Sequence, residues 1–283
     1  MIYEHQIKMV VMDIDGTLIG SSKRISELTK KVLKEAAEHD IQLVIASGRP
    51  LQAIPEMLLQ LPGMAGCITS NGSSIFSLPA KERIFARDLE PSQVMEIMEC
   101  YKKAQSLARI PLEVFIAGQA YASASYVKTP EAFGAKAKEG DYVKSTRMPV
   151  ENIIDHVMAH QTEIEGLNFI IADPMIKQEV RRWLAAIPEI YLTSSASRYI
   201  EISHGSVCKW HAICHLADDK GINIEEIATF GDGENDLEMV MHAGFGVAMG
   251  NAVPELKAAA DYIAPDCEQD GVAKTIIQLI NNN

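Results

Sequence analysis

Short apolar runs alternate with helical periodicity in the first eighty residues of the chain. Residues 7–12 and 41–46 are mostly apolar and of strand length. Between them, residues 27–38 repeat apolar side chains at helical spacing, on a face that includes Leu28 and Val32. Strand, helix and strand in this order form a βαβ unit, which predicts a parallel sheet.

The pattern changes at about Lys81. A helix is predicted from Ser92, and polar and apolar residues then alternate over 112–127, as in an antiparallel sheet with one wet face. Residues 128–142 are rich in Gly and Lys and predict a loop or a short helix. An Asp-Pro pair then predicts the capped start of a helix over about 174–187.

The βα alternation returns after Ser203. The elements predicted there are a helix at 209–220, a strand at 227–230, a helix from about 236, a strand at 245–248 and a closing helix from 271. The parallel-sheet domain is thus interrupted. We predict an α/β protein with a discontinuous core, residues 1–82 and 195–283, around an inserted α+β domain at 83–194.

The charge of the chain limits its partners. The sequence has 283 residues with a formal net charge of −12 and a pI near 5.2. A nucleic-acid module needs clustered Lys and Arg to displace counterions, so we expect no nucleic-acid partner.

Cysteine usage and the amino terminus indicate the compartment. The five cysteines are an odd number without CxxC spacing, which is typical of reduced thiols. The amino-terminal stretch MIYEHQIKM lacks the apolar core of a signal peptide, and no apolar run is long enough to span a bilayer. We therefore expect a cytoplasmic protein without a membrane partner.

Polar clusters follow the predicted strands of the core. Asp13 and Asp15 come at the end of the first apolar run, where a carboxylate is costly to desolvate unless a cation meets it. Ser47-Gly48-Arg49 follows the second run, and the sequence FGDGENDLEM, with Asp232 to Asp236, follows a later strand and opens a helix. Lys209 stands at the start of the helix that returns to the core.

These clusters predict a common site. Ligands of open α/β sheets gather beyond the carboxyl ends of the strands. Carboxylates suit a hard cation such as Mg²⁺, which keeps several waters and bridges to phosphate, while an ammonium, a hydroxyl and freed backbone amides suit the phosphate itself. Asp13 and Asp15 are thus predicted to face a metal and a phosphoryl group.

The motifs carry a family resemblance. MDIDGTL, ASGRP, the lysine of HGSVCKW, and GDGENDLEM followed by GVAMGNA resemble, in order and spacing, the four motifs of the haloacid dehalogenase (HAD) superfamily. The chain is most similar to the Cof-type phosphatases with a type IIB cap. The resemblance implies a Rossmann-like parallel-sheet core and an inserted α+β cap domain. Ser47 stands where threonine is more usual, and it keeps the hydroxyl.

The resemblance implies a role for each acidic residue. Asp13 would be the nucleophile that forms an aspartyl phosphate, and Asp15 would be the general acid and then the base. Mg²⁺ would be held by the Asp13 carboxylate, the main-chain carbonyl of Asp15 and Asp232. Asp236 would orient Lys209 or a metal-bound water.

The phosphate oxygens would be bound by a second set of groups. By the same resemblance these are Ser47, the Gly48 amide, Lys209 and Asn235. Arg49 either contacts the substrate beyond its phosphate or forms a surface salt bridge.

The predicted function is that of an Mg²⁺-dependent phosphatase of small phosphomonoesters, such as sugar phosphates or a phosphorylated cofactor. A phosphomutase, which returns the phosphoryl group to another hydroxyl, is an alternative within the same chemistry. A non-catalytic phospholigand sensor is the alternative from another class, although a sensor needs no nucleophile. The oligomeric state stays open at this point.

Overall fold

The computed structural model describes residues 3–22 and 24–281. By its internal contacts the chain divides into two compact units. The first unit contains Met1–Gly48, Pro55–Phe85 and Cys208–Asn283, and the second contains Arg49–Ile54 and Ala86–Val207. None of the described helices combines the length and apolar character needed to cross a membrane.

A mostly parallel sheet forms the centre of the first unit. Within the described residues it has eight strands in the order β14-β13-β12-β1-β2-β3-β4-β5. The paired strands run parallel from β14 to β3, and β4 is antiparallel to β3. The strands are β1 (Met9–Met12), β2 (Gln42–Ala46), β3 (Met64–Thr69), β4 (Ser74–Ser77), β5 (Arg83–Ala86), β12 (Ile227–Gly231), β13 (Phe245–Ala248) and β14 (Tyr262–Ile263). The predicted parallel sheet is confirmed.

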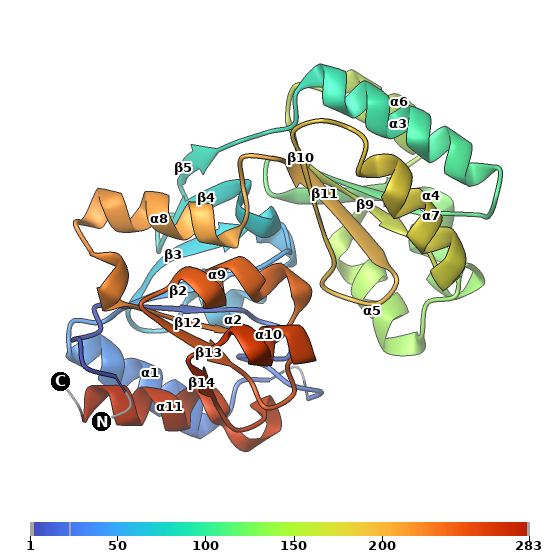
Figure 1. Cartoon of the computed structure of the whole chain (residues 1–283). Helices are drawn as coiled ribbons and strands as arrows, with labels where there is room; N and C mark the ends of the chain where they lie inside the picture. The colour runs from blue at the N-terminus through green and yellow to red at the C-terminus, as the bar shows by residue number, and fades with distance from the viewer. Residues whose placement is uncertain (1–2, 23, 282–283) are drawn as a thin grey trace. The chain divides into compact units, whose positions relative to one another are not determined.

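Helices cover both faces of this sheet (Figure 1). Met9, Val11 and Val44 pack in one cluster with residues of α8 (Lys209–Lys220) and α9 (Leu237–His242). The alternate residues Val10 and Leu43 point to the other face, where α1 (Glu27–Glu38) packs on α11 (Gly271–Ile280). Burial on two faces explains why these strands are apolar at nearly every position. The shorter helices of this unit are α2 (Glu56–Leu59) and α10 (Pro254–Ala259).

The second unit contains its own sheet, with the order β10-β11-β9-β6-β7-β8. Its pairs are antiparallel except β7 with β8. The strands are β6 (Leu112–Ile116), β7 (Gln119–Ser123), β8 (Arg147–Val150), β9 (Ile164–Ile170), β10 (Ile190–Thr193) and β11 (Tyr199–His204). The helices are α3 (Pro91–Gln105), α4 (Ala124–Lys128), α5 (Ala137–Thr146), α6 (Ile153–Ala159) and α7 (Pro174–Leu184). Asp173 caps α7, as predicted.

One prediction in this unit is wrong in part. The alternation over 112–127 gives the antiparallel pair β6–β7, but the chain turns into α4 after Ser123. The Ser123 hydroxyl accepts a hydrogen bond from the Tyr126 amide and caps the new helix. Tyr126 and Val127 are therefore buried as helix residues and not as strand residues.

The limits of the units lie near, but not at, the residues expected from the pattern. The sequence placed the return to the core at about residue 195, whereas β11 pairs with β9 and β10 in the second sheet. The short segment Arg49–Ile54 also groups with the second unit, where the Gln52 amide donates to the carbonyl of Gly118. The assignment of a catalytic core and a cap to particular residues stays a prediction.

Candidate active site

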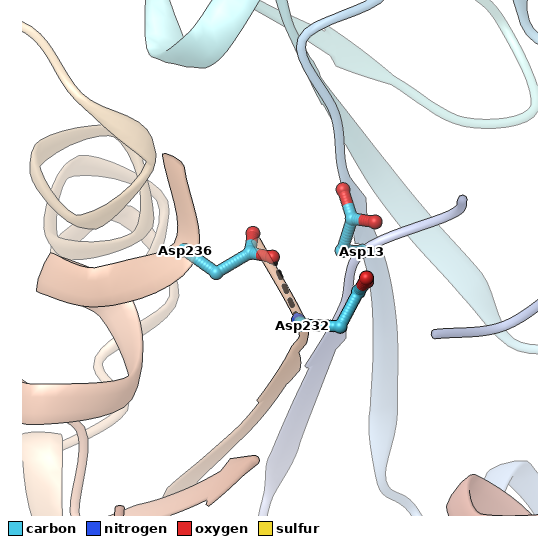
Figure 2. A group of neighbouring side chains, drawn as sticks. All are labelled: Asp13, Asp232 and Asp236. Atoms are coloured by element: carbon cyan, nitrogen blue, oxygen red, sulfur yellow. Dashed lines mark hydrogen bonds between the residues drawn. The ribbon is translucent and has the colours of Figure 1, made fainter. Parts of the chain in front are cut away.

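Two neighbouring strand ends carry the first carboxylates of the site. Asp13 follows β1, Asp232 follows β12, and the two strands pair in parallel. The Asp13 amide continues the ladder by donating to the Phe230 carbonyl over 3.0 Å. The carboxyl ends of the strands therefore meet, and Figure 2 shows Asp13 and Asp232 side by side, with Asp236 facing them from the start of the next helix.

The three carboxylates form one cluster. Each of Asp13, Asp232 and Asp236 offers an oxygen atom, and these atoms lie within 4.8 Å of one another. Burial raises the pKa of Asp13 well above its usual range, and the charges of Asp236 and Asp232 add to that effect, although Lys209 opposes it. Burial and Asp236 likewise raise the pKa of Asp232 to about 7. Gathered carboxylates whose ionised forms are disfavoured in this way are a suitable site for a cation.

Lys209 lies between two of these carboxylates. Its ammonium donates to Asp13 Oδ1 and to Asp236 Oδ1, each over 2.6 Å, and its side chain is 1% exposed. Burial alone would lower the pKa of Lys209, but the two carboxylates outweigh burial and raise it. The ammonium therefore stays charged, as the phosphate-binding role predicted for Lys209 requires. Of the two roles predicted for Asp236, the orientation of Lys209 corresponds to this contact.

The turns around Asp232 hold it by short contacts. Thr17 donates to Asp232 Oδ1 over 2.9 Å. Asp236 Oδ2 accepts from the amides of Asp232 and Gly233, both at 2.9 Å. Gly16 has a φ of +87°, and a Cβ there would overlap the Asp232 carboxylate. The turn that follows β1 therefore requires glycine at position 16. Asp15, half-buried in the same turn, is not part of the three-carboxylate cluster.

Two of the phosphate-binding candidates follow strands of the same unit. Ser47 follows β2 and is 2% exposed, and Asn235 is 4% exposed within the helical turn after β12. Arg49 belongs to the second unit, where its guanidinium donates to the Ala53 carbonyl and lies 4.6 Å from the centroid of the Tyr142 ring.

The sequence did not single out two asparagines of this region, Asn71 and Asn251. Asn235 Nδ2 donates to Asn71 Oδ1 over 3.0 Å, and Asn251 Nδ2 donates to the Gly16 carbonyl over 2.7 Å. Asn251 lies within the quoted GVAMGNA, and Asn71 within an Asn-Gly pair after β3. An Asn-Gly pair is so common in tight turns that it gave no separate signal of a site.

Comparison with known proteins identifies the family. The sequence profile of the haloacid dehalogenase-like hydrolases matches residues 10–276. The chain belongs to this family. The resemblance found in the four motifs is therefore confirmed.

Two relatives of this HAD-like hydrolase are named as phosphatases. The 5-amino-6-(5-phospho-D-ribitylamino)uracil phosphatase YcsE of Bacillus subtilis (strain 168) is 30% identical over 270 residues, which are 95% of this chain and 94% of that protein. The HMP-PP phosphatase of Klebsiella pneumoniae (strain 342) is 27% identical over 97% of this chain and 96% of its own length.

Solved structures share the fold of the HAD-like hydrolase. The HAD subclass IIB sugar phosphatase BT4131 gives a TM-score of 0.80 at 26% identity, with 96% of this chain and 98% of that chain covered. A haloacid dehalogenase-like hydrolase from Bacteroides thetaiotaomicron gives a TM-score of 0.79 at 26% identity, with 97% of this chain and 100% of that chain covered. The predicted fold, a Rossmann-like core with an inserted α+β cap, is confirmed, and the chain is an HAD-type phosphatase of the Cof-type group.

Proposed function

We propose that this HAD-type phosphatase is Mg²⁺-dependent and hydrolyses small phosphomonoesters through an aspartyl phosphate on Asp13. The observation that carries the proposal is the arrangement of Asp13, Lys209 and Asp236. A buried ammonium 2.6 Å from the carboxylate at the end of β1 provides positive charge where an incoming phosphate would add negative charge.

In the proposed mechanism, two successive displacements at phosphorus, first by Asp13 and then by water, replace one direct displacement. An oxygen of Asp13 attacks phosphorus, the bond from phosphorus to the ester oxygen breaks, and Asp15 gives its proton to the leaving alcohol. Asp15 then takes a proton from water as the water oxygen attacks phosphorus. The bond to Asp13 breaks, and inorganic phosphate leaves. Ser47, the Gly48 amide, Lys209 and Asn235 bind the phosphoryl oxygens during both steps.

The carboxylate cluster fits Mg²⁺. Both oxygens of Asp236 already accept hydrogen bonds, from Lys209 and from two backbone amides. This leaves Asp13 and Asp232 as the carboxylate ligands, with the main-chain carbonyl of Asp15 as a third donor. A bound Mg²⁺ supplies positive charge against the phosphoryl oxygens. Asp236 instead keeps Lys209 in place.

The substrate class is that of a small phosphorylated metabolite. The relatives named for a ribitylamino-uracil phosphate, for HMP-PP and for a sugar phosphate support this size and chemistry. The net charge of −12 supports the absence of a nucleic-acid partner. We assign selectivity among metabolites to the inserted cap, residues 83–194, because the residues proposed for phosphoryl transfer lie outside it. Five free cysteines support a cytoplasmic location.

The test is a phosphate-release screen over metabolite phosphates with Mg²⁺, run beside Asp13→Asn. We expect release of inorganic phosphate by the wild type and none by the variant, since asparagine keeps the shape of Asp13 but does not attack phosphorus. Turnover without release of phosphate would indicate a phosphomutase. No turnover over the whole panel would indicate a phospholigand sensor, and activity above a few per cent in Asp13→Asn would move the nucleophile elsewhere.

A further inference from the structure

The turn between β3 and β4 has an unusual backbone. Ser70 and Asn71 have φ angles of +50° and +55°, in a region that L-residues other than glycine enter rarely. Gly72 follows with a φ of +105°. Ser70 and Asn71 are 3% and 5% exposed. Two successive left-handed residues persist in a buried turn only when the surroundings stabilise them.

The surroundings of this turn are the segments proposed to bind phosphate. The Asn71 amide donates to the Ser47 carbonyl over 3.1 Å. The Asn71 side chain accepts from Asn235 Nδ2 over 3.0 Å, although the two residues are 164 positions apart. A Cβ on Gly72 would overlap the Cys208 carbonyl, directly before Lys209. The turn therefore contacts the loop of Ser47, the turn of Asn235 and the start of α8.

The contact with Asn235 has a chemical consequence. A carboxamide can rotate to present either its oxygen or its amino group to a ligand. Asn71 presents its Oδ1, an acceptor, to Asn235, and this contact favours the orientation in which Asn235 Nδ2 points toward Asn71. This bond uses one N–H of Nδ2, and the amide nitrogen carries a second N–H that can donate to a phosphoryl oxygen.

We propose that Asn71 is a positioning residue of the phosphate site, which fixes the carboxamide of Asn235 in its donating orientation. The inference rests on the proposed function. A plain turn between β3 and β4 is the rival explanation, since Asn-Gly is a frequent turn pair. An ordinary turn, however, needs neither the burial of Asn71 nor its side-chain bond to a distant asparagine.

A double-mutant cycle between Asn71→Gly and Asn235→Ala tests the proposal. Glycine accepts the left-handed backbone without strain, so the change removes the Asn71 side chain, and with it the acceptor for Asn235, while the turn keeps its conformation. We expect Asn71→Gly to lower kcat/KM and to raise the Kd for inorganic phosphate, each on the order of 10- to 100-fold. In the Asn235→Ala background the same change should add less than about threefold, because the group that Asn71 positions is already absent. Losses that multiply in the double variant would overturn the proposal.

Two controls keep the result interpretable. Asp40→Gly makes the same kind of change at an exposed residue with a φ of +59°, and it should leave kcat/KM and the Kd for phosphate unchanged. If Asn71→Gly unfolds, Asn71→Ser replaces it in the cycle, since the shorter hydroxyl does not reach Asn235. The Kd is measured by calorimetry with Mg²⁺ and inorganic phosphate. An inactive wild type would overturn the proposed function, whereas the Kd cycle would still decide the role of Asn71.

Discussion

The ammonium of Lys209 donates a 2.6 Å hydrogen bond to the carboxylate of Asp13. Both side chains lie within the first unit, and Lys209 is buried. Loss of one partner of a buried ion pair leaves an uncompensated charge, whereas loss of both partners is tolerated better. This asymmetry makes the contribution of Lys209 to stability separable from its contribution to activity.

Lys209→Met should therefore reduce both stability and activity. We expect a loss of about 3–5 kcal/mol in the free energy of unfolding, measured in urea with Mg²⁺ present. We also expect a fall in kcat/KM on the order of 100-fold or more. The double variant Lys209→Met/Asp236→Asn should recover part of the stability but none of the activity. Recovery of activity in that variant would exclude Lys209 from phosphate binding.

Asp15→Asn should discriminate between leaving groups. Without a general acid, expulsion of a poorly acidic alcohol becomes slow, while an activated aryl phosphate needs little protonation. We expect kcat for alkyl phosphates to fall by a larger factor than the rate at which aryl alcohol is released in a single turnover. The two factors should differ at least about 100-fold. Rapid-quench kinetics on both substrate classes measure this difference. An equal loss for all leaving groups would show that Asp15 is not the acid.

Mg²⁺ should stabilise the folded chain through Asp232. A ligand that binds only the folded state at 100 times its Kd adds about 2.7 kcal/mol. We expect Mg²⁺ to raise the Tm of the wild type and to raise that of Asp232→Asn far less. EDTA should abolish phosphate release, and added Mg²⁺ should restore it. Asp219→Asn, a change at an exposed acid of α8, is the control and should respond as the wild type does. Full activity in metal-free buffer would contradict the metal assignment.

His204 should make the stability of the second unit depend on pH. Burial and the neighbouring Arg87 guanidinium lower the pKa of His204, although Glu90 and Glu189 oppose this. Arg87 Nη2 lies 3.0 Å from His204 Nε2, which must therefore accept, and Ser206 Oγ lies 2.8 Å from Nδ1. The unfolded chain, with an ordinary histidine pKa of about 6.5, takes up the proton first as pH falls.

The stability that neutral His204 contributes is thus present above about pH 6.5 and is lost as pH falls through the folded-state pKa. Urea unfolding of the wild type and of His204→Gln over this range measures the effect, because the glutamine oxygen can still accept from Arg87 but does not titrate. We expect the variant to lose less stability than the wild type on acidification. Parallel pH profiles for the two proteins would contradict the prediction.

Local pattern predicted much of the core. The apolar runs gave β1 and β2, and the carboxyl ends of parallel strands brought Asp13 and Asp232 together as expected. The pattern failed where individual hydrogen bonds, local or distant, decide the structure. Alternation alone does not distinguish the end of β7 from the start of α4, which depends on a capping bond from Ser123. The role proposed for Asn71 depends on its hydrogen bond to Asn235, which is 164 positions away in the sequence, so no short stretch of sequence indicates it.

The position of β1 within its sheet has a consequence for synthesis of the chain on the ribosome. β1 lies between β2 and β12, so one edge of this wholly apolar strand is unpaired until residues 227–231 emerge. The second sheet, β6 to β11, is by then complete, because all its strands lie within residues 112–204. The inserted unit can therefore fold first, while the nascent β1 edge is open to mispairing or to a chaperone.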